Sequence, residues 1–192
     1  MVREKKFTQD ELYRATHKLI LEVGYDNFSF MLLSKRLQIS RAALYKYYAN
    51  KDDLILDYLT AQMEQLVLQL NSIEWSTDFK EKLSQLISLI FEYADTHTIS
   101  YMIPSQKWNN ENANLSHVQK SKKLHTTFYD FIQRTIEEGQ NKGYLLKTVP
   151  SMLIIELIFH SITLPNRTGL NTAERTQHIT EILLHGILKN PI

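Results

Sequence analysis

The chain has 192 residues, 43% of them hydrophobic, which suits one large domain or a small domain joined to a larger one. It contains no cysteine, which excludes disulfides, thiolate nucleophiles and cysteine-based zinc sites. Only five glycines and four prolines interrupt it, so the composition favours long helices over many short strands.

Charge is divided unevenly along the chain. Residues 1–52 carry ten basic and six acidic side chains, whereas residues 53–192 carry twelve and fifteen. A basic segment on an acidic remainder favours an anionic partner for that segment. The sequence shows no signal peptide and no apolar stretch near the roughly 20 residues that span a bilayer. We therefore expect a cytoplasmic protein without membrane association.

The first predicted helix begins after Thr8 and ends near Gly24. Thr8 and Glu11 have the spacing of a capping box, and apolar residues repeat at helical steps from Leu12 to Val23. Gly24 is expected to be a left-handed C-cap.

Two short helices follow, joined by a tight turn. Ser29 and Ser40 are good N-caps for helices over 30–37 and about 41–48. Leu44 and Tyr48 are four residues apart and are expected to face inward, which turns the small and basic residues of 41–46 outward. This arrangement predicts a helix-turn-helix, whose second helix enters the major groove of DNA.

The remainder of the chain predicts only further helices. Their expected ranges are about 51–71, 78–95, 98–107, 115–141, 149–164 and 172–188, and apolar residues recur in them at steps of three and four. No stretch shows the alternation of a strand. We therefore expect an all-α fold of about nine helices, with a three-helix head over residues 1–50 and a larger helical body over residues 51–192.

Residues 29–54 resemble the signature of the tetracycline-repressor (TetR) family of bacterial transcription regulators. The resemblance includes Leu-Tyr-Lys-Tyr-Tyr at 44–48 and Lys-Asp-Asp-Leu at 51–54, and it covers about residues 7–55. It implies a DNA-binding head, a ligand-binding and dimerisation domain over 51–192, dimerisation through the last two helices, and release of DNA on ligand binding. Gln38 stands where the family often has glycine, and Ser34 where alanine is common.

The outward face of helix 41–48 carries the predicted DNA contacts. Arg41 can reach a guanine edge, and the two alanines allow close approach to a thymine methyl group. Tyrosine and lysine side chains suit phosphates, and Lys51 begins a helix whose free amides attract an anion. The predicted contacts with double-stranded DNA are Ser29, Ser40, Arg41, Ala42, Ala43, Tyr45, Lys46, Tyr47 and Lys51.

Aromatic residues on several helices of the body suggest a pocket for a small apolar or amphipathic ligand. Ordinary core packing is the alternative explanation for the same residues. The predicted lining residues are Phe91, Tyr101, Met102, Trp108, Phe128, Phe159 and His160.

The last two predicted helices are more apolar than a surface hairpin needs. An apolar face left over on a monomer is a liability, and pairing it with its copy about a two-fold axis buries it. We predict a homodimer interface containing Ile154, Ile158, Ile162, Ile179, Leu183, Gly186 and Ile187, with completion of the monomer core as the alternative.

The sequence contains no catalytic constellation, and its seven histidines show no spacing typical of metal ligands. We therefore expect no enzymatic activity, no metal and no cofactor. The predicted function is a transcription regulator, a repressor that binds a palindromic operator as a dimer and is released by a ligand. The alternative is a helix-turn-helix that docks a protein partner without binding DNA or an inducer.

Overall fold

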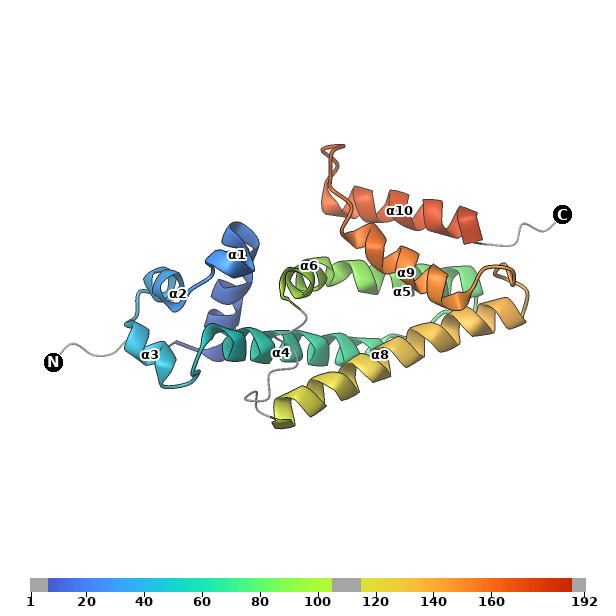
Figure 1. Ribbon diagram of the computed structural model, residues 1–192. Helices are drawn as coiled ribbons and strands as arrows, with labels where there is room; N and C mark the ends of the chain where they lie inside the picture. The colour runs from blue at the N-terminus through green and yellow to red at the C-terminus, as the bar shows by residue number, and fades with distance from the viewer. Residues whose placement is uncertain (1–6, 105–114, 188–192) are drawn as a thin grey trace. The chain divides into compact units, whose positions relative to one another are not determined.

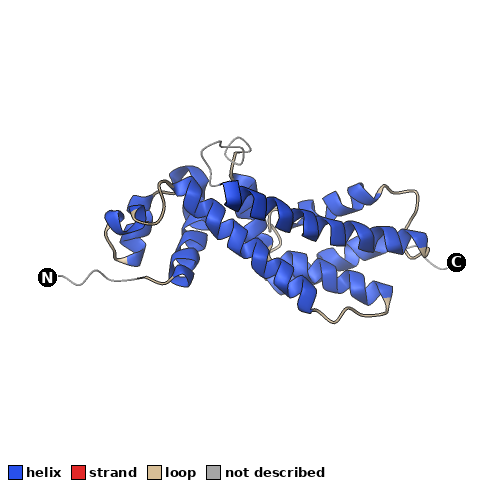
Figure 2. Ribbon diagram, turned by 90° about the horizontal axis from the view of Figure 1, so that it is seen from below, coloured by secondary structure: helices blue, strands red, loops and turns tan. Residues whose placement is uncertain are grey.

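The computed structural model describes residues 7–104 and 115–187, and all regular elements in these ranges are helices (Figures 1 and 2). The predicted all-α fold is confirmed. The helices are α1 (Gln9–Asn27), α2 (Phe30–Leu37), α3 (Arg41–Tyr45), α4 (Lys51–Ser72), α5 (Phe79–Glu92), α6 (Ala94–Met102), α8 (Leu115–Asn141), α9 (Ser151–Ile162) and α10 (Thr172–Ile187).

The helices pack as two units. The first comprises the described residues of Met1–Gln65 and Asp95–Lys123, and the second those of Leu66–Ala94 and Leu124–Ile192. The first unit therefore contains α1, α2, α3 and α6 together with the N-terminal parts of α4 and α8. The predicted boundary after residue 50 divides the chain by expected role, and it stays a prediction.

Side-chain caps set the starts of the N-terminal helices. Thr8 and Glu11 form the predicted capping box, with the Glu11 amide donating to Thr8 Oγ1 at 3.1 Å and the Thr8 amide donating to Glu11 Oε2 at 2.9 Å. Ser29 Oγ accepts from the Leu32 amide at 3.4 Å, and Ser40 Oγ accepts from the Ala43 amide at 3.2 Å. Each cap satisfies an amide that has no partner within its helix.

Gly24 interrupts α1 instead of ending it. Its φ of 76° and ψ of 164° lie outside the left-handed helical region, in a conformation that is essentially restricted to glycine. The chain bends there and makes one more helical turn before Phe28, whose amide donates to the Gly24 carbonyl at 3.1 Å. The prediction that Gly24 ends the helix as a left-handed C-cap is therefore wrong, because the helix continues for one turn beyond it.

The first unit is organised around one hydrophobic core. Four of its residues are at most 1% exposed, namely Leu12 and Ile20 of α1, Leu33 of α2 and Leu44 of α3. Residues of α4 and α6 complete this core, among them Ile99, which is fully buried. The three-helix head therefore shares its core with two further helices.

In the second unit, Gly139 allows a close approach between α8 and α5. A Cβ atom at this position would lie 2.2 Å from Cζ of Phe79. The Phe79 ring is stacked on Tyr144, with centroids 5.0 Å apart, so it has little room to move. The chain leaves α8 through Gly143, which has a φ of 80°.

Several predicted helix boundaries differ from the observed ones, among them the end of α3, which was predicted at about residue 48 and lies at Tyr45. The helix predicted over 78–95 ends at Glu92, because Tyr93 leaves helical geometry with φ −98° and ψ 19°. The next helix was predicted over 98–107 but spans Ala94–Met102. Apolar periodicity runs through this junction without a glycine or proline to mark it.

Candidate DNA-binding surface

Helix α3 presents an exposed face and a buried one, as predicted. Leu44 is completely buried and anchors the helix in the core of the first unit. Arg41, Ala42 and Lys46 are exposed on the surface of α3 and its C-cap, and Ala43 is half-buried. A short helix with this division can lay its exposed side against another molecule.

Two tyrosines next to this face are exposed but held by ring contacts. Tyr45 is 58% exposed and packs edge-on against Phe30 of α2, with ring centroids 5.0 Å apart. Tyr47 is 70% exposed and makes a similar contact with Phe7 at 5.5 Å. Both hydroxyl groups are thus carried on oriented rings.

The turn between α2 and α3 contains a left-handed residue. Gln38 has φ 56° and ψ 43°, and the Ile39 amide donates to the Ser34 carbonyl at 3.0 Å across it. For a residue with a Cβ atom this conformation costs roughly 1–2 kcal/mol. The turn keeps the left-handed geometry that suits glycine, although glutamine occupies it.

Lys51 is placed differently from the other predicted contacts. Its ammonium group donates to the carbonyl oxygens of Tyr25 at 2.8 Å, Asp26 at 3.3 Å and Phe28 at 3.3 Å. It also lies over the Tyr25 ring, 4.4 Å from the centroid. A phosphate would have to compete with three carbonyls at the end of α1, so the phosphate contact of Lys51 stays a prediction.

An acidic residue of α4 fixes the chain that leaves α3. Asp57 Oδ2 accepts hydrogen bonds from Tyr13 Oη of α1 at 2.7 Å and from Tyr48 Oη at 2.6 Å. Desolvation by burial, followed by the bond to Asp57, raises the pKa of Tyr13 to about 12 and raises that of Tyr48 as well. Both tyrosines therefore stay protonated and donate at neutral pH.

A second tyrosine–aspartate pair lies nearby, where Tyr25 Oη donates to Asp52 Oδ1 at 2.7 Å. Helical periodicity predicts the inward position of Tyr48, but it does not predict its partner Asp57 or the Tyr25–Asp52 pair. These partners are 9 and 27 residues apart in the chain, beyond the reach of helical periodicity.

The residues predicted to line a ligand pocket are distributed over both units. Tyr101 is 59% exposed and Met102 is 39% exposed in the first unit, and Trp108 lies outside the described residues. In the second unit Phe128 is buried and Phe159 is half-buried, with ring centroids 6.3 Å apart, while Phe91 is buried and His160 exposed. The aromatic pocket stays a prediction.

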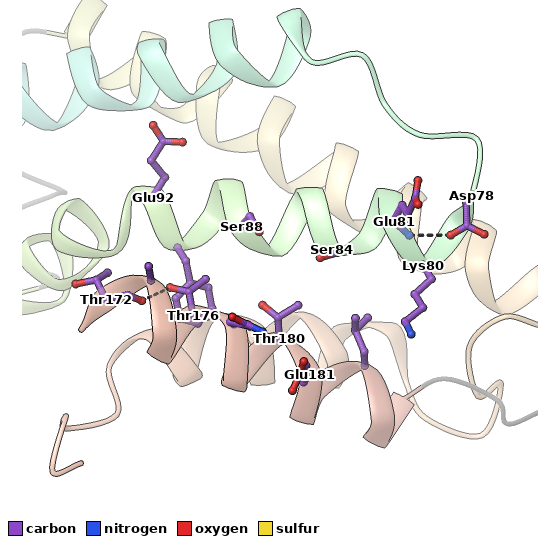
Figure 3. A pocket seen from close by; sticks show the side chains of 14 residues that line it. Asp78, Lys80, Glu81, Ser84, Ser88, Glu92, Thr172, Thr176, Thr180 and Glu181 are labelled. Carbon is purple, nitrogen blue, oxygen red and sulfur yellow. Dashed lines mark hydrogen bonds between the residues drawn. The ribbon is translucent and has the colours of Figure 1, made fainter. Parts of the chain in front are cut away.

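A groove of about 870 Å³ separates α5 from α10 in the second unit (Figure 3). It is lined largely by hydroxyl-bearing and charged residues. Phe91, which was predicted to contact the ligand, also lines this groove. Thr180 lines it too, with a buried hydroxyl that has no hydrogen-bond partner among the described residues. This lining differs in character from the predicted aromatic pocket.

The predicted dimer face of α9 is inverted. Ile154, Ile158 and Ile162 are at most 5% exposed within a single chain, which contradicts the prediction that they face a partner. The helix is apolar on nearly all sides, so periodicity could not decide which side turns inward. The exposed apolar side chains are instead Met152, Leu153 and Leu157, each between 45% and 52% exposed.

On α10 the predicted interface residues are mixed. Ile179 and Leu183 are half-buried and Gly186 is exposed, whereas the side chain of Ile187 lies outside the described ones. The large apolar residue exposed on this helix is Ile182, at 70%. These residues do not by themselves test dimerisation.

The helix-turn-helix with an exposed basic second helix defines a DNA-binding transcription regulator. The sequence profile of the tetR family of bacterial regulatory proteins matches residues 12–58. The HTH-type transcriptional regulator YhgD of Bacillus subtilis (strain 168) is 22% identical over 156 residues, covering 77% of this chain and 81% of YhgD. The N-terminal helix-turn-helix of the chain therefore matches the tetR family model, and the relative that covers most of the chain is also an HTH-type transcriptional regulator.

Solved structures share the fold over nearly the whole chain. The ketosteroid transcriptional regulator KstR2 of Mycobacterium tuberculosis aligns with a TM-score of 0.69 and 19% identity, covering 99% of this chain and 100% of KstR2. The regulator FadR from Bacillus subtilis in complex with stearoyl-CoA aligns with a TM-score of 0.66 and 20% identity, covering 95% and 100%. A transcriptional regulator from Saccharomonospora viridis in complex with choline aligns with a TM-score of 0.67 and 19% identity, covering 95% and 98%.

The family whose model matches residues 12–58 consists of bacterial regulatory proteins, in agreement with the predicted class of transcription regulator. In the part of the chain that the structure describes, no helix combines the length and apolar character needed to cross a membrane.

Proposed function

We propose that this regulator binds a palindromic operator as a homodimer and represses transcription until a small-molecule ligand releases it. The observation that carries the proposal is the outer face of α3, where Arg41, Tyr45 and Lys46 are exposed around a completely buried Leu44. Two such faces related by a two-fold axis match the two half-sites of a palindrome.

In this proposal the contacts divide into base readers and phosphate contacts. Arg41 reads a guanine edge through a bidentate contact, and Ala42 and Ala43 let the helix approach a thymine methyl group. The other contacts hold the head against phosphates without reading the sequence. These are Ser29, Ser40, Tyr45, Lys46 and Tyr47.

The proposed homodimer uses the exposed side of α9 in place of the buried one. Leu153 and Leu157, four residues apart, form a short apolar row on the exposed side of this helix. Met152 is exposed next to Leu153, and Ile182 adds an exposed apolar side chain on α10. Such a row is unfavourable in water and is buried when the same face of a second copy covers it. A two-fold dimer also supplies the symmetry that a palindrome requires.

The proposed ligand is small and apolar or amphipathic. The aromatic cluster of Phe128, Tyr129 and Phe159 supports this class, with Tyr129 and Phe159 stacked at 5.3 Å between centroids. Two regulators of the same fold bind organic molecules of related character: stearoyl-CoA is amphipathic, and choline is a small organic cation. A thermal-shift screen of acyl-CoA thioesters, fatty acids and quaternary amines tests this part.

The DNA-binding part is tested by selecting duplexes from a random library and measuring affinity for the best one. Arg41→Ala is expected to lose discrimination between bases by about 1–3 kcal/mol, the value of a good bidentate contact. Lys46→Ala is expected to weaken all sequences about equally and to reduce the salt dependence of binding. Arg134→Ala removes an exposed arginine on α8 and is the control.

Retention of full sequence preference in Arg41→Ala would contradict the assignment of base reading. The alternative of a protein-docking helix-turn-helix would be favoured if the selection yielded no preferred sequence and if DNA binding were weak and insensitive to salt. The salt titration separates the two functions because contacts with phosphates release counterions.

A further inference from the structure

A histidine in the middle of α1 connects two other helices of the first unit. His17 Nδ1 lies 2.6 Å from Tyr58 Oη of α4, and His17 Nε2 lies 3.5 Å from Asp95 Oδ2 in the first turn of α6. The side chain of His17 is 29% exposed and Tyr58 is 1% exposed, whereas the side chain of Asp95 is 67% exposed. One imidazole thus bridges α4 and α6 from α1.

The same three helices also share apolar contacts. Ile99 and Ile103, at the middle of α6 and just after its end, belong to the hydrophobic core that contains Leu44 of α3. Helix α6 is therefore an integral part of the packing that supports the recognition helix. A displacement of α6 cannot leave the core of the head unchanged, because packed interiors tolerate few voids.

When the imidazole is neutral, one tautomer gives both of its nitrogen atoms a suitable hydrogen-bonding role. Tyr58 Oη donates to Nδ1, which leaves the hydrogen on Nε2 to face the Asp95 carboxylate. Burial raises the pKa of Tyr58 to about 12, so its hydroxyl keeps its proton. The Tyr58 hydroxyl has a second hydrogen-bond partner in Thr96 of α6. Loss of His17 therefore removes one of two polar links between α4 and α6, and it leaves this buried hydroxyl with fewer partners, which is costly.

We propose that His17 is a positioning residue that couples α6 to the DNA-binding head. The inference rests on the proposed function, because it concerns the regulation of the proposed operator binding. Coupling between sites is reciprocal. Operator binding at α3 therefore stabilises α6, and a change in the position of α6 weakens operator binding.

The test measures this reciprocity without a ligand. Hydrogen exchange of the amides in Ala94–Met102 is recorded with and without the tightest duplex selected from a random library. The variants are His17→Leu, which removes both polar contacts, and His17→Asn and His17→Gln, whose amides stand in for Nδ1 and Nε2 respectively. Asp95→Asn alters the α6 side of the bridge at an exposed position that does not endanger folding.

In the wild-type protein we expect the duplex to slow exchange in α6. In His17→Leu this slowing is lost and affinity falls about 2- to 30-fold, the range for residues that modulate coupling between sites. Asp95→Asn is expected to reduce the slowing with a smaller loss of affinity. Arg14→Gln is the matched control, because it removes an exposed ion pair with Asp10 on α1 and does not involve α6.

The proposal would be overturned if the duplex slowed exchange in α6 as much in His17→Leu and Asp95→Asn as it does in the wild-type protein. If His17→Leu fails to fold, as judged by circular dichroism, Asp95→Asn and His17→Asn decide between the same two outcomes. A wild-type protein that selects no duplex would contradict the proposed function itself, and this result differs from tight binding without coupling.

Discussion

Replacing Lys51 by methionine separates a structural role from a DNA contact at the start of α4. Methionine keeps the length of the side chain and removes the ammonium group, which donates to three carbonyl oxygens at 2.8–3.3 Å and lies over the Tyr25 ring. The main effect is therefore expected on the stability of the head. Direct contact with phosphate would predict a loss of affinity instead.

The magnitude follows from these contacts. Hydrogen bonds from a charged donor contribute about 1.5–3 kcal/mol, and a partly exposed cation–π contact about 0.5–1 kcal/mol. Water can replace the donor at the exposed Asp26 carbonyl but less well at Tyr25 and Phe28, whose bonds are part-buried. We expect a loss of about 2–4 kcal/mol, which corresponds to a decrease in Tm of roughly 5–15 °C for a chain of this size.

The assay pairs thermal unfolding with binding to the selected duplex at a temperature where every variant is folded. Lys18→Met, on the exposed surface of α1, removes the same charge and is expected to leave Tm unchanged. Lys46→Met is the comparison for a proposed phosphate contact. An unchanged Tm for Lys51→Met, with affinity for all duplexes reduced as in Lys46→Met, would refute the structural role.

Three further predictions concern the turn, the second unit and the oligomer. Gln38→Gly is expected to stabilise the protein by about 0.5–1 kcal/mol in urea unfolding, because it relieves the left-handed backbone strain, and a decrease would contradict this. Gly139→Ala should cost about 1–3 kcal/mol in thermal unfolding, since its Cβ would clash with the Phe79 ring; a neutral result would mean that the ring yields. Leu157→Glu should give a monomer by sedimentation with weak operator binding, whereas Leu68→Glu, at another exposed leucine, should not; equal dimerisation in both variants would exclude this face.

The sequence by itself determined the local features of the DNA-binding head. Thr8, Ser29 and Ser40 cap their helices through atoms only three residues away, so the signal and its partner lie within one short segment. The inward position of Leu44 follows from helical periodicity in the same way. Short-range hydrogen bonding and a 3.6-residue repeat are properties of the chain, and they were sufficient for the all-α fold and the helix-turn-helix.

Only the tertiary structure decided which of several chemically suitable surfaces is used. On α9, isoleucine and leucine alternate around the helix, so the inward side depends on what packs against it, and Ile158 turned out to face the core while Leu157 faces solvent. Lys51 carries a charge that suits a phosphate, yet folding brings the end of α1 within its reach. His17 acquires its role only where α4 and α6 meet, because its partners are 41 and 78 residues away in the sequence and only packing brings them together.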